Sequence, residues 1–147
     1  MKLAFFGLGA IGKPMSERLI DNGYDLNLFN RNKLNNDYEQ KYFSDPKEAV
    51  LDCDGLLICV TDDAAVESIL FGENGVADSL KPNSFIIDFS TISPDKSINI
   101  HKRLCKKNIL YVDCPVSGGT EGAHNGSLSL FIGASKKECE SFEKIFE

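Results

Sequence analysis

Short apolar segments alternate along the chain with longer segments in which apolar residues recur at helical spacing. Continuous apolar segments are typical of strands buried on both faces, and spacings of three and four residues are typical of amphipathic helices. The apolar segments predict strands at residues 2–6, 25–29, 55–60, 84–89, 109–114 and 127–133. The intervening segments predict helices at residues 11–22, 46–53, 63–71, 95–107 and from 136 onward, with a further short helix ending near residue 80.

Several of the predicted helices begin at residues that favour helix starts. Asp45 is followed by a proline, which suits the first position of a helix. Asp62 or Asp63 is expected to cap the helix after residue 60. Ser135 is expected to cap the last helix, with Glu138 at the capping-box position. These signals place the helix starts more firmly than the helix ends.

Two further expectations concern the exposure of apolar side chains, and a third concerns a polar segment. In the helix at 95–107 the expected buried face consists of Ile98, His101, Leu104 and Cys105. The last helix begins an apolar face with Cys139, Phe142, Ile145 and Phe146, and the last three are expected to be exposed and available for self-association. Residues 34–40 are polar and rich in asparagine, which predicts a loop or a short helix.

The alternation of strands and helices, with little sign of hairpins, determines the expected fold class. It implies right-handed β-α-β crossovers and an α/β fold of the Rossmann type, with a doubly wound, mostly parallel sheet and helices on both faces. The chain has 147 residues, which corresponds to one domain spanning residues 1–147.

Composition narrows the classes of partner. The chain has 16 basic and 22 acidic residues and a net charge of -6, so we expect neither nucleic acid nor an anionic membrane as partner. Its apolar segments fall far short of the roughly 20 residues that a membrane span needs. The five cysteines form no C-x-x-C pair, so we expect free thiols in a reducing cytoplasm and no metal site.

A glycine-rich turn is the strongest local signal. Gly7-Leu8-Gly9-Ala10-Ile11-Gly12 is a G-x-G-x-x-G motif between the first strand and the first helix, the context that a dinucleotide-binding turn requires. Gly7 permits the tight turn, Gly9 lets a pyrophosphate approach the backbone, and Gly12 lets the helix pack on the strand. Free N–H groups and the helix dipole would then hold the phosphates. The alternative is a structural turn without a ligand.

Residues at the end of the second predicted strand indicate whether the fold prefers NAD or NADP. A fold that prefers NAD places Asp or Glu there, where it binds the ribose 2′-hydroxyl. This chain has Asn30, Arg31 and Asn32 instead, with no carboxylate to repel a 2′-phosphate. The planar guanidinium of Arg31 suits phosphate, and the asparagines can add hydrogen bonds. The sequence therefore predicts NADP rather than NAD, unless Arg31 is only a solvated surface residue.

Four segments resemble the β-hydroxyacid dehydrogenases, a family that includes 3-hydroxyisobutyrate dehydrogenase, succinic semialdehyde and glyoxylate reductases and, more distantly, 6-phosphogluconate dehydrogenase. They are residues 6–15 (FGLGAIGKPM), 60–66 (VTDDAAV) with 70–72 (LFG), 88–94 (DFSTISP), and 113–119 (DCPVSGG) continuing to 128. The fourth segment is the most specific, because it separates this family from Rossmann domains in general.

The resemblance implies roles for particular residues. Val60, Thr61 and Asp62 follow a predicted strand, at the edge where open α/β sheets bind ligands, and by resemblance Val60 and Thr61 flank the cofactor. Val66 would pack on the adenine side, and Thr91 would lie beside the nicotinamide. Ser117, Gly118 and Gly119 resemble the family's substrate-binding loop, whose backbone N–H groups and serine hydroxyl would hold a small carboxylate substrate.

The resemblance also implies a reaction, hydride transfer between a nicotinamide and a small hydroxyacid or its aldehyde or keto form. In the family a lysine of a following all-helical domain carries the acid-base step, and that domain builds most of a homodimer or larger oligomer. We therefore expect residues 1–147 to bind cofactor without turnover and to contain no catalytic residue. The alternatives are a 6-phosphogluconate dehydrogenase-like enzyme or a non-catalytic dinucleotide-binding module, which the sequence beyond Glu147 would distinguish.

Overall fold

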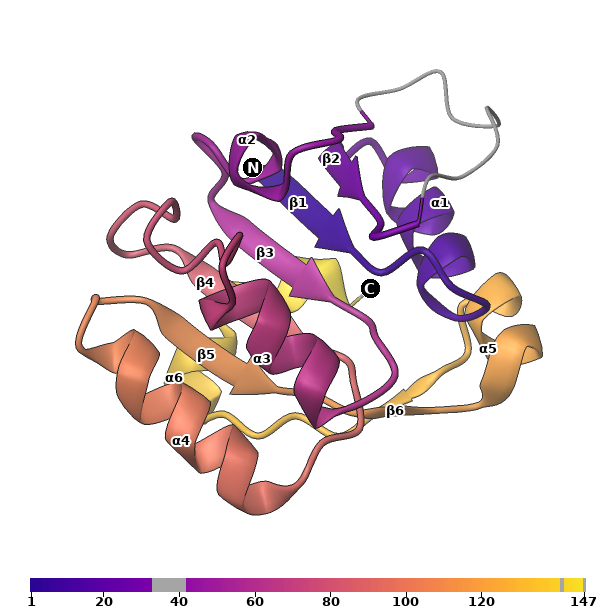
Figure 1. The fold of residues 1–147 in the computed structure, drawn as a ribbon. Helices are drawn as coiled ribbons and strands as arrows, with labels where there is room; N and C mark the ends of the chain where they lie inside the picture. The colour runs from indigo at the N-terminus through magenta and orange to yellow at the C-terminus, as the bar shows by residue number, and fades with distance from the viewer. Residues whose placement is uncertain (33–41, 141, 147) are drawn as a thin grey trace.

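The computed structural model describes residues 1–32, 42–140 and 142–146. A five-stranded parallel sheet forms its centre, with the strand order β2-β1-β3-β4-β5 (Figure 1). The strands are β1 (Lys2–Phe6), β2 (Asp25–Phe29), β3 (Gly55–Ile58), β4 (Phe85–Asp88) and β5 (Leu110–Asp113). Each lies within a segment predicted from its apolar residues, so the expected parallel α/β sheet is confirmed.

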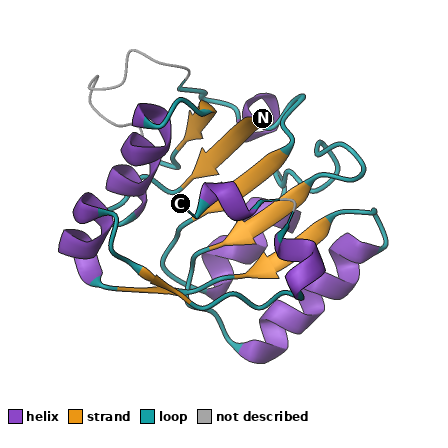
Figure 2. Ribbon diagram, turned by 180° about the vertical axis from the view of Figure 1, so that it is seen from behind, coloured by secondary structure: helices purple, strands orange, loops and turns teal. Residues whose placement is uncertain are grey.

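Helices cover both faces of this sheet (Figure 2). On one face lie α2, α3 and α4, and on the other lie α1 and the C-terminal segment. The helices are α1 (Gly12–Asp21), α2 (Pro46–Ala49), α3 (Asp63–Phe71), α4 (Pro94–Cys105), α5 (Gly119–Asn125) and α6 (Lys136–Cys139), followed by the 3₁₀ turn η1 (Glu143–Ile145). In the part of the chain that the structure describes, no helix is both long and apolar enough to cross a membrane.

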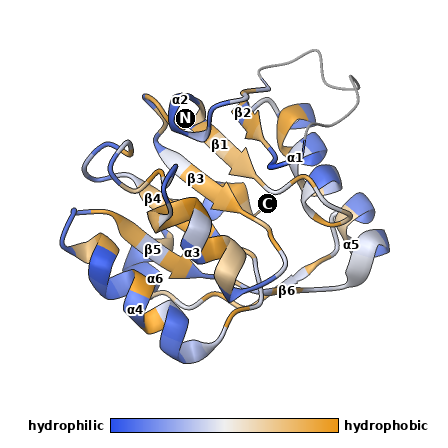
Figure 3. Cartoon of the chain, viewed as in Figure 1, coloured by the Kyte–Doolittle hydropathy of each residue, from blue (hydrophilic) through white to orange (hydrophobic). Residues whose placement is uncertain are grey.

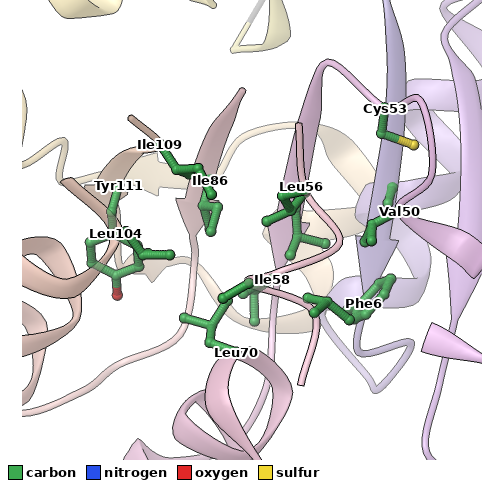
Figure 4. Close-up of a cluster of buried hydrophobic side chains, with 14 of the residues drawn as sticks. Phe6, Val50, Cys53, Leu56, Ile58, Leu70, Ile86, Leu104, Ile109 and Tyr111 are labelled. Carbon is green, nitrogen blue, oxygen red and sulfur yellow. The ribbon is translucent and has the colours of Figure 1, made fainter. Parts of the chain in front are cut away.

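Two hydrophobic clusters fill the layers above and below the strands. Phe6, Ile58 and Ile86 point to the face covered by α3 and α4 (Figure 4), and the intervening strand residues point to the other face. Because both faces are covered, the strands are almost entirely apolar, whereas the helices carry hydrophilic residues on their outer sides (Figure 3). The continuous apolar segments of the sequence follow directly from this double burial.

The strand order creates a switch point between β1 and β3. From β1 the chain crosses to β2 on one side and then returns to β3 on the other side of β1. The connections that leave the carboxyl ends of β1 and β3 therefore diverge, and a crevice opens between them. In open α/β sheets ligands bind at this position.

Some local predictions are wrong. Residues 127–133 contribute no strand to the main sheet. Only β7 (Ser129–Leu130) forms, and it pairs antiparallel with β6 (Val116–Ser117) as a separate two-stranded sheet. α2 is shorter than predicted, and residues near 80 form turns rather than a helix. The predicted loop or helix at 34–40 lies outside the described residues.

The predicted buried face of α4 is correct at Leu104 but wrong at Ile98, His101 and Cys105, which are exposed. Ile100 and Leu104 are fully buried, whereas Ile98 is 52% exposed. Residues 98 and 100 lie on nearly opposite sides of a helix, so only one isoleucine can face the sheet. Ile100 takes that position because it shares a face with Leu104.

The C-terminal residues belong to the core, which corrects the expected exposed apolar end. Phe142 is 1% exposed and Ile145 is 8% exposed. The rings of Phe142 and Phe85 lie 5.6 Å apart, and Phe146 packs edge-on against Phe142. Ser135 and Glu138 do form the predicted capping box, but α6 ends after one turn. After α6 the aromatic residues pack over the sheet, and no described helix extends into solvent there.

Candidate functional site

The three glycines of the β1–α1 turn have different structural roles. Gly7 has a φ of 95°, and a Cβ at this position would overlap the carbonyl oxygen of Cys59. A Cβ at Gly12 would overlap the carbonyl oxygen of Gly7. At Gly9, in contrast, a Cβ would meet no atom within 4 Å. Two glycines are therefore required by packing, and the middle one leaves open space in front of the backbone.

The amino end of α1 lies directly behind this turn. Its N-cap residue, Ile11, makes no side-chain capping hydrogen bond, and the first turn of the helix contains no acidic residue. The positive end of the helix dipole is therefore not neutralised by its own cap. This arrangement suits an anion bound in front of the turn.

Asn30 connects the carboxyl end of β2 to the glycine-rich turn. Its Oδ1 accepts a hydrogen bond from the backbone N–H of Leu8 at 3.0 Å. Its Nδ2 donates to the carbonyl oxygen of Asn32 at 2.9 Å, and the Tyr42 hydroxyl donates to the Asn30 carbonyl oxygen at 3.0 Å. The Asn30 side chain is thus engaged within the protein, while the side chains of Arg31 and Asn32 are exposed.

A pocket of about 180 Å³ lies at the switch point between β1 and β3. It contains seven of the residues that the sequence predicts for cofactor binding: Gly7, Gly9, Asn30, Arg31, Asn32, Val60 and Thr61. Four further lining residues were not predicted: Phe29, Cys59, Ala65 and Ile69. The positions of Phe29 and Cys59 at or next to strand ends, and the helical spacing of Ala65 and Ile69, are signals that could have identified them.

Val66, which the sequence predicts on the adenine side, does not line the pocket. It is fully buried in the core cluster between the sheet and α3. Its neighbours Ala65 and Ile69 lie on the side of α3 that lines the pocket. Successive helical residues are about 100° apart, so Val66 faces the sheet when Ala65 faces the crevice.

The other predicted cofactor residues surround the pocket without lining it. Leu8 and Gly12 are buried, and Ala10 and Ile11 lie between them in the turn. Asp62 is the N-cap of α3, and its carboxylate accepts a hydrogen bond from the N–H of Ala65 at 2.8 Å. That hydrogen bond, with one from Thr61, lowers the pKa of Asp62 below its ordinary value.

Polar contacts hold the β3–α3 connection. The backbone N–H of Val60 donates to the Ser90 hydroxyl at 3.0 Å. At the start of α3, Asp63 accepts hydrogen bonds from the backbone N–H of Ser93 at 2.9 Å and from its hydroxyl at 2.6 Å. The wall of the pocket that begins at Val60 is therefore tied to the residues that follow β4.

The thiol of Cys59 in the pocket wall has low reactivity. Burial raises the pKa of Cys59 to about 11, and the negative charge of Asp88 adds to the shift. A thiol with this pKa is almost entirely protonated at neutral pH and is a weak nucleophile. Among the described residues, no cluster of side chains suits a metal ion.

The predicted nicotinamide and substrate residues lie apart from this pocket. Thr91 is exposed and follows the carboxyl end of β4. Ser117 is an exposed residue of β6, and Gly118 and Gly119 begin α5 with φ angles of 140° and 63°. These two conformations favour glycine, which explains the glycine pair. Thr91 and Ser117–Gly119 are absent from the pocket lining described above.

A larger pocket of about 370 Å³ lies elsewhere, among α1, α5 and the C-terminal residues 144–146. Its walls include Met15, Arg18, Tyr24 and Phe89. None of the residues predicted from the sequence to bind cofactor or substrate lines this pocket. The candidate site is therefore the smaller pocket, where the glycine-rich turn, the end of β2 and the β3–α3 connection meet.

Residues 2–147 match the family described as the NAD binding domain of 6-phosphogluconate dehydrogenase. The chain is 33% identical over 150 residues to 2-(hydroxymethyl)glutarate dehydrogenase of Eubacterium barkeri, covering 99% of this chain and 50% of the relative. It is 31% identical over 150 residues to 2-hydroxy-3-oxopropionate reductase of Escherichia coli, covering 100% of this chain and 51% of the relative.

Among solved structures, 3-hydroxyisobutyrate dehydrogenase of Mycobacterium tuberculosis with L-serine superimposes with a TM-score of 0.89. It is 25% identical in sequence, and the match covers 99% of this chain and 50% of that one. The chain therefore spans about half the length of the relatives that it matches.

Proposed function

Because the chain belongs to the family of the NAD binding domain of 6-phosphogluconate dehydrogenase, we propose that residues 1–147 are the NADP-binding domain of a hydroxyacid oxidoreductase. The pocket at the β1–β3 switch point carries this proposal. It combines an open glycine and an exposed arginine in one crevice, and the uncapped amino end of α1 follows the glycine-rich turn. No other set of functional groups in the described residues matches an anionic dinucleotide as closely.

Each part of the pocket suits one part of the cofactor. The pyrophosphate would lie in front of Gly9, where a Cβ would otherwise stand. The adenine would lie against the wall formed by Ala65 and Ile69, because an aromatic base packs well against apolar side chains. A bound nicotinamide would accept or release the hydride, and the residues of this chain would orient it.

We propose NADP as the preferred cofactor because of the end of β2. In the described chain, Arg31 and Asn32 are the exposed side chains beside the ribose position, and neither is a carboxylate. A 2′-phosphate would receive paired N–H donors from Arg31, and neither described side chain at this position would repel it. Asn30 acts differently from the sequence expectation, since its side chain is bound within the protein.

Calorimetric titration with NADPH and NADH tests this preference directly. The chain contains no tryptophan, so NADPH emission provides a second signal without interference from tryptophan. Arg31→Ala is expected to weaken NADPH binding roughly 10- to 100-fold and to leave NADH binding nearly unchanged, because it removes a charge-assisted contact to phosphate. The matched control is Arg18→Ala, which removes an exposed arginine of α1 outside the pocket.

Tighter binding of NADH than of NADPH by the unaltered chain would contradict the preference for NADP. An equal loss for both cofactors in Arg31→Ala would show that Arg31 contacts the shared part of the molecule. Binding of neither cofactor would contradict the assignment of the pocket. Titration with 2′-phosphorylated and unphosphorylated adenosine separates these outcomes, because only the 2′-phosphate distinguishes the two ligands.

For the parent reaction we propose hydride transfer to or from a small hydroxyacid, with Thr91 beside the nicotinamide and Ser117–Gly119 at the substrate carboxylate. The support is their position after β4 and β5 and the two glycines in left-handed conformations. A cytoplasmic homodimer is part of the same proposal. Amide chemical-shift changes at residues 117–119, on adding 3-hydroxyisobutyrate to the NADP-saturated chain, would support the carboxylate site, and unchanged shifts would contradict it.

A further inference from the structure

Asp88 is a fully buried carboxylate at the last position of β4. Its Oδ1 accepts a hydrogen bond from the backbone N–H of Ser90 at 2.9 Å, and its Oδ2 accepts one from the hydroxyl of Tyr111, on β5, at 2.8 Å. The Ser90 hydroxyl in turn accepts the backbone N–H of Val60 at 3.0 Å. These contacts run from β5, through the buried end of β4, to the partly buried wall of the pocket.

We propose that Asp88 and Ser90 are positioning residues that hold the Val60 segment of the dinucleotide pocket in its binding geometry. This inference rests on the proposed function. Val60 follows β3, beyond the last residue of the strand ladder, so its N–H needs an acceptor outside the sheet. Ser90 supplies that acceptor, and Asp88 fixes Ser90.

Val60 also packs against the glycine-rich turn. A Cβ built at Gly7 would meet both the carbonyl oxygen of Cys59 and a side-chain carbon of Val60, so these two segments are already in close contact. A shift of Val60 would therefore move one wall of the pocket and also the packing against Gly7. Asp88 itself has no exposed surface and does not line the pocket, so it acts through Ser90 rather than on a ligand.

A purely structural role would not require a carboxylate at this position. Burial of an acid is costly unless hydrogen bonds satisfy it, and here burial raises the pKa of Asp88 while hydrogen bonds from Ser90 and Tyr111 oppose the shift. Apolar residues fill the neighbouring positions of β4. The carboxylate accepts hydrogen bonds from the serine that holds Val60 and from a tyrosine of the next strand.

Ser90→Ala tests the inference, and the chain offers a matched control. Ser84 lies just before the opposite end of β4 and is 1% exposed, and its hydroxyl has no hydrogen-bond partner among the described residues. Ser90→Ala is expected to weaken NADPH binding about 5- to 10-fold and to speed hydrogen exchange at the Val60 amide, since it removes a single buried acceptor. Ser84→Ala is expected to change neither quantity.

Tyr111→Phe provides a second variant that preserves side-chain shape. It removes one hydrogen bond to Asp88, so NADPH binding should weaken by a smaller factor, about 2- to 5-fold. Because the proposal routes this effect through Ser90, Tyr111→Phe should add no further loss of affinity in the Ser90→Ala background. Independent losses that multiply in the double variant would overturn the proposed route.

The outcomes distinguish this inference from the proposed function. If the unaltered chain binds neither NADPH nor NADH, the proposed function fails, and this inference fails with it. If the unaltered chain binds and Ser90→Ala binds equally well, only the positioning role fails. An equal loss of NADPH affinity in Ser90→Ala and Ser84→Ala would also overturn the positioning role. The Ser84 hydroxyl makes no hydrogen bond to the described pocket wall, so the loss could not then be assigned to the Ser90–Val60 hydrogen bond.

Discussion

The side-chain oxygen of Asn30 accepts a hydrogen bond from the backbone N–H of Leu8 across 3.0 Å. This contact joins the end of β2 to the β1–α1 turn, two segments that are separated in sequence by the whole of α1. It uses one N–H of the glycine-rich turn within the protein, so the turn is already fixed before a ligand binds. A turn fixed in advance loses less conformational entropy on binding.

Replacement of Asn30 by alanine is expected to weaken NADPH and NADH binding to a similar extent. The loss of one partly buried acceptor predicts roughly a 5- to 10-fold change in Kd for both cofactors. Calorimetric titration would measure it. The matched control is Asn22→Ala. It removes an exposed asparagine at the other end of α1, whose Nδ2 donates to the Arg18 carbonyl oxygen. A loss confined to NADPH would contradict the positioning role and favour direct contact of Asn30 with the 2′-phosphate.

Alanine at Gly9 and alanine at Gly12 are expected to have opposite consequences. A Cβ at Gly9 meets no atom within 4 Å, so Gly9→Ala should fold normally but occupy the space proposed for the pyrophosphate. A Cβ at Gly12 overlaps the Gly7 carbonyl oxygen, so Gly12→Ala should destabilise the fold by about 1–3 kcal/mol. Urea unfolding and NADPH titration of both variants would measure the two effects.

The two glycine variants also test whether the pocket is a phosphate site at all. If Gly9→Ala retained the full affinity for NADPH, the pyrophosphate would have to lie away from this residue. If Gly12→Ala unfolded at the same urea concentration as the unaltered chain, the close packing of α1 against the turn would not limit stability. Either result would contradict the separate roles assigned to the two glycines.

The sequence predicts the sheet well because double burial requires continuous apolar strands. Five predicted strand segments contain the strands of the parallel sheet, and the aspartates and prolines locate the starts of α2, α3 and α4. Asn27 shows the limit of this pattern. It lies in the middle of β2 yet is 1% exposed, because its Nδ2 donates to the Ala49 carbonyl oxygen at 2.7 Å. That partner lies in another element, so the local sequence does not reveal it.

The candidate site was predictable where a motif specifies backbone geometry and not where tertiary contacts decide. The glycine-rich turn and Arg31 were identified from residue type and spacing, and the pocket contains them. Ala65 lines the pocket and Val66 does not, a choice that depends on how α3 rotates against the sheet. The Ser90–Val60 contact joins the end of β4 to the segment after β3, 30 residues away in sequence, so no local pattern indicates it.

Truncation of Phe142 should destabilise the protein strongly despite its place near the end of the chain. Its side chain is 1% exposed and packs against Phe85 and Phe146. Phe142→Ala is expected to lower the free energy of unfolding by about 3–5 kcal/mol, the usual cost of a large cavity. Phe131, which is 61% exposed, is the matched control, and Phe131→Ala should change stability by less than about 0.5 kcal/mol. Equal effects of the two substitutions would show that the C-terminal segment is not part of the cooperative core.

The buried carboxylate of Asp88 predicts a pH dependence of stability with a definite sign. Burial raises the pKa of Asp88 above its ordinary value of 3.8, so the folded protein holds this proton more tightly than the unfolded chain. Its contribution to stability is therefore fully present below pH 3.8 and is lost as the pH rises through the raised pKa. Asparagine does not ionise, so Asp88→Asn should gain stability relative to the unaltered chain as the pH rises across this interval.

Asp54 provides a control of opposite sign. Hydrogen bonds from the Lys81 ammonium and the Lys2 backbone lower the pKa of Asp54, so its contribution is present above pH 3.8 and lost below it. Asp54→Asn should therefore lose stability relative to the unaltered chain as the pH rises. Urea unfolding followed by circular dichroism between about pH 3 and pH 7 would measure both differences. Stability differences that change in the same direction with pH for both variants would contradict the opposite pKa shifts on which the prediction rests. Stability differences that change in opposite directions would follow from a buried acid at Asp88 and a paired one at Asp54.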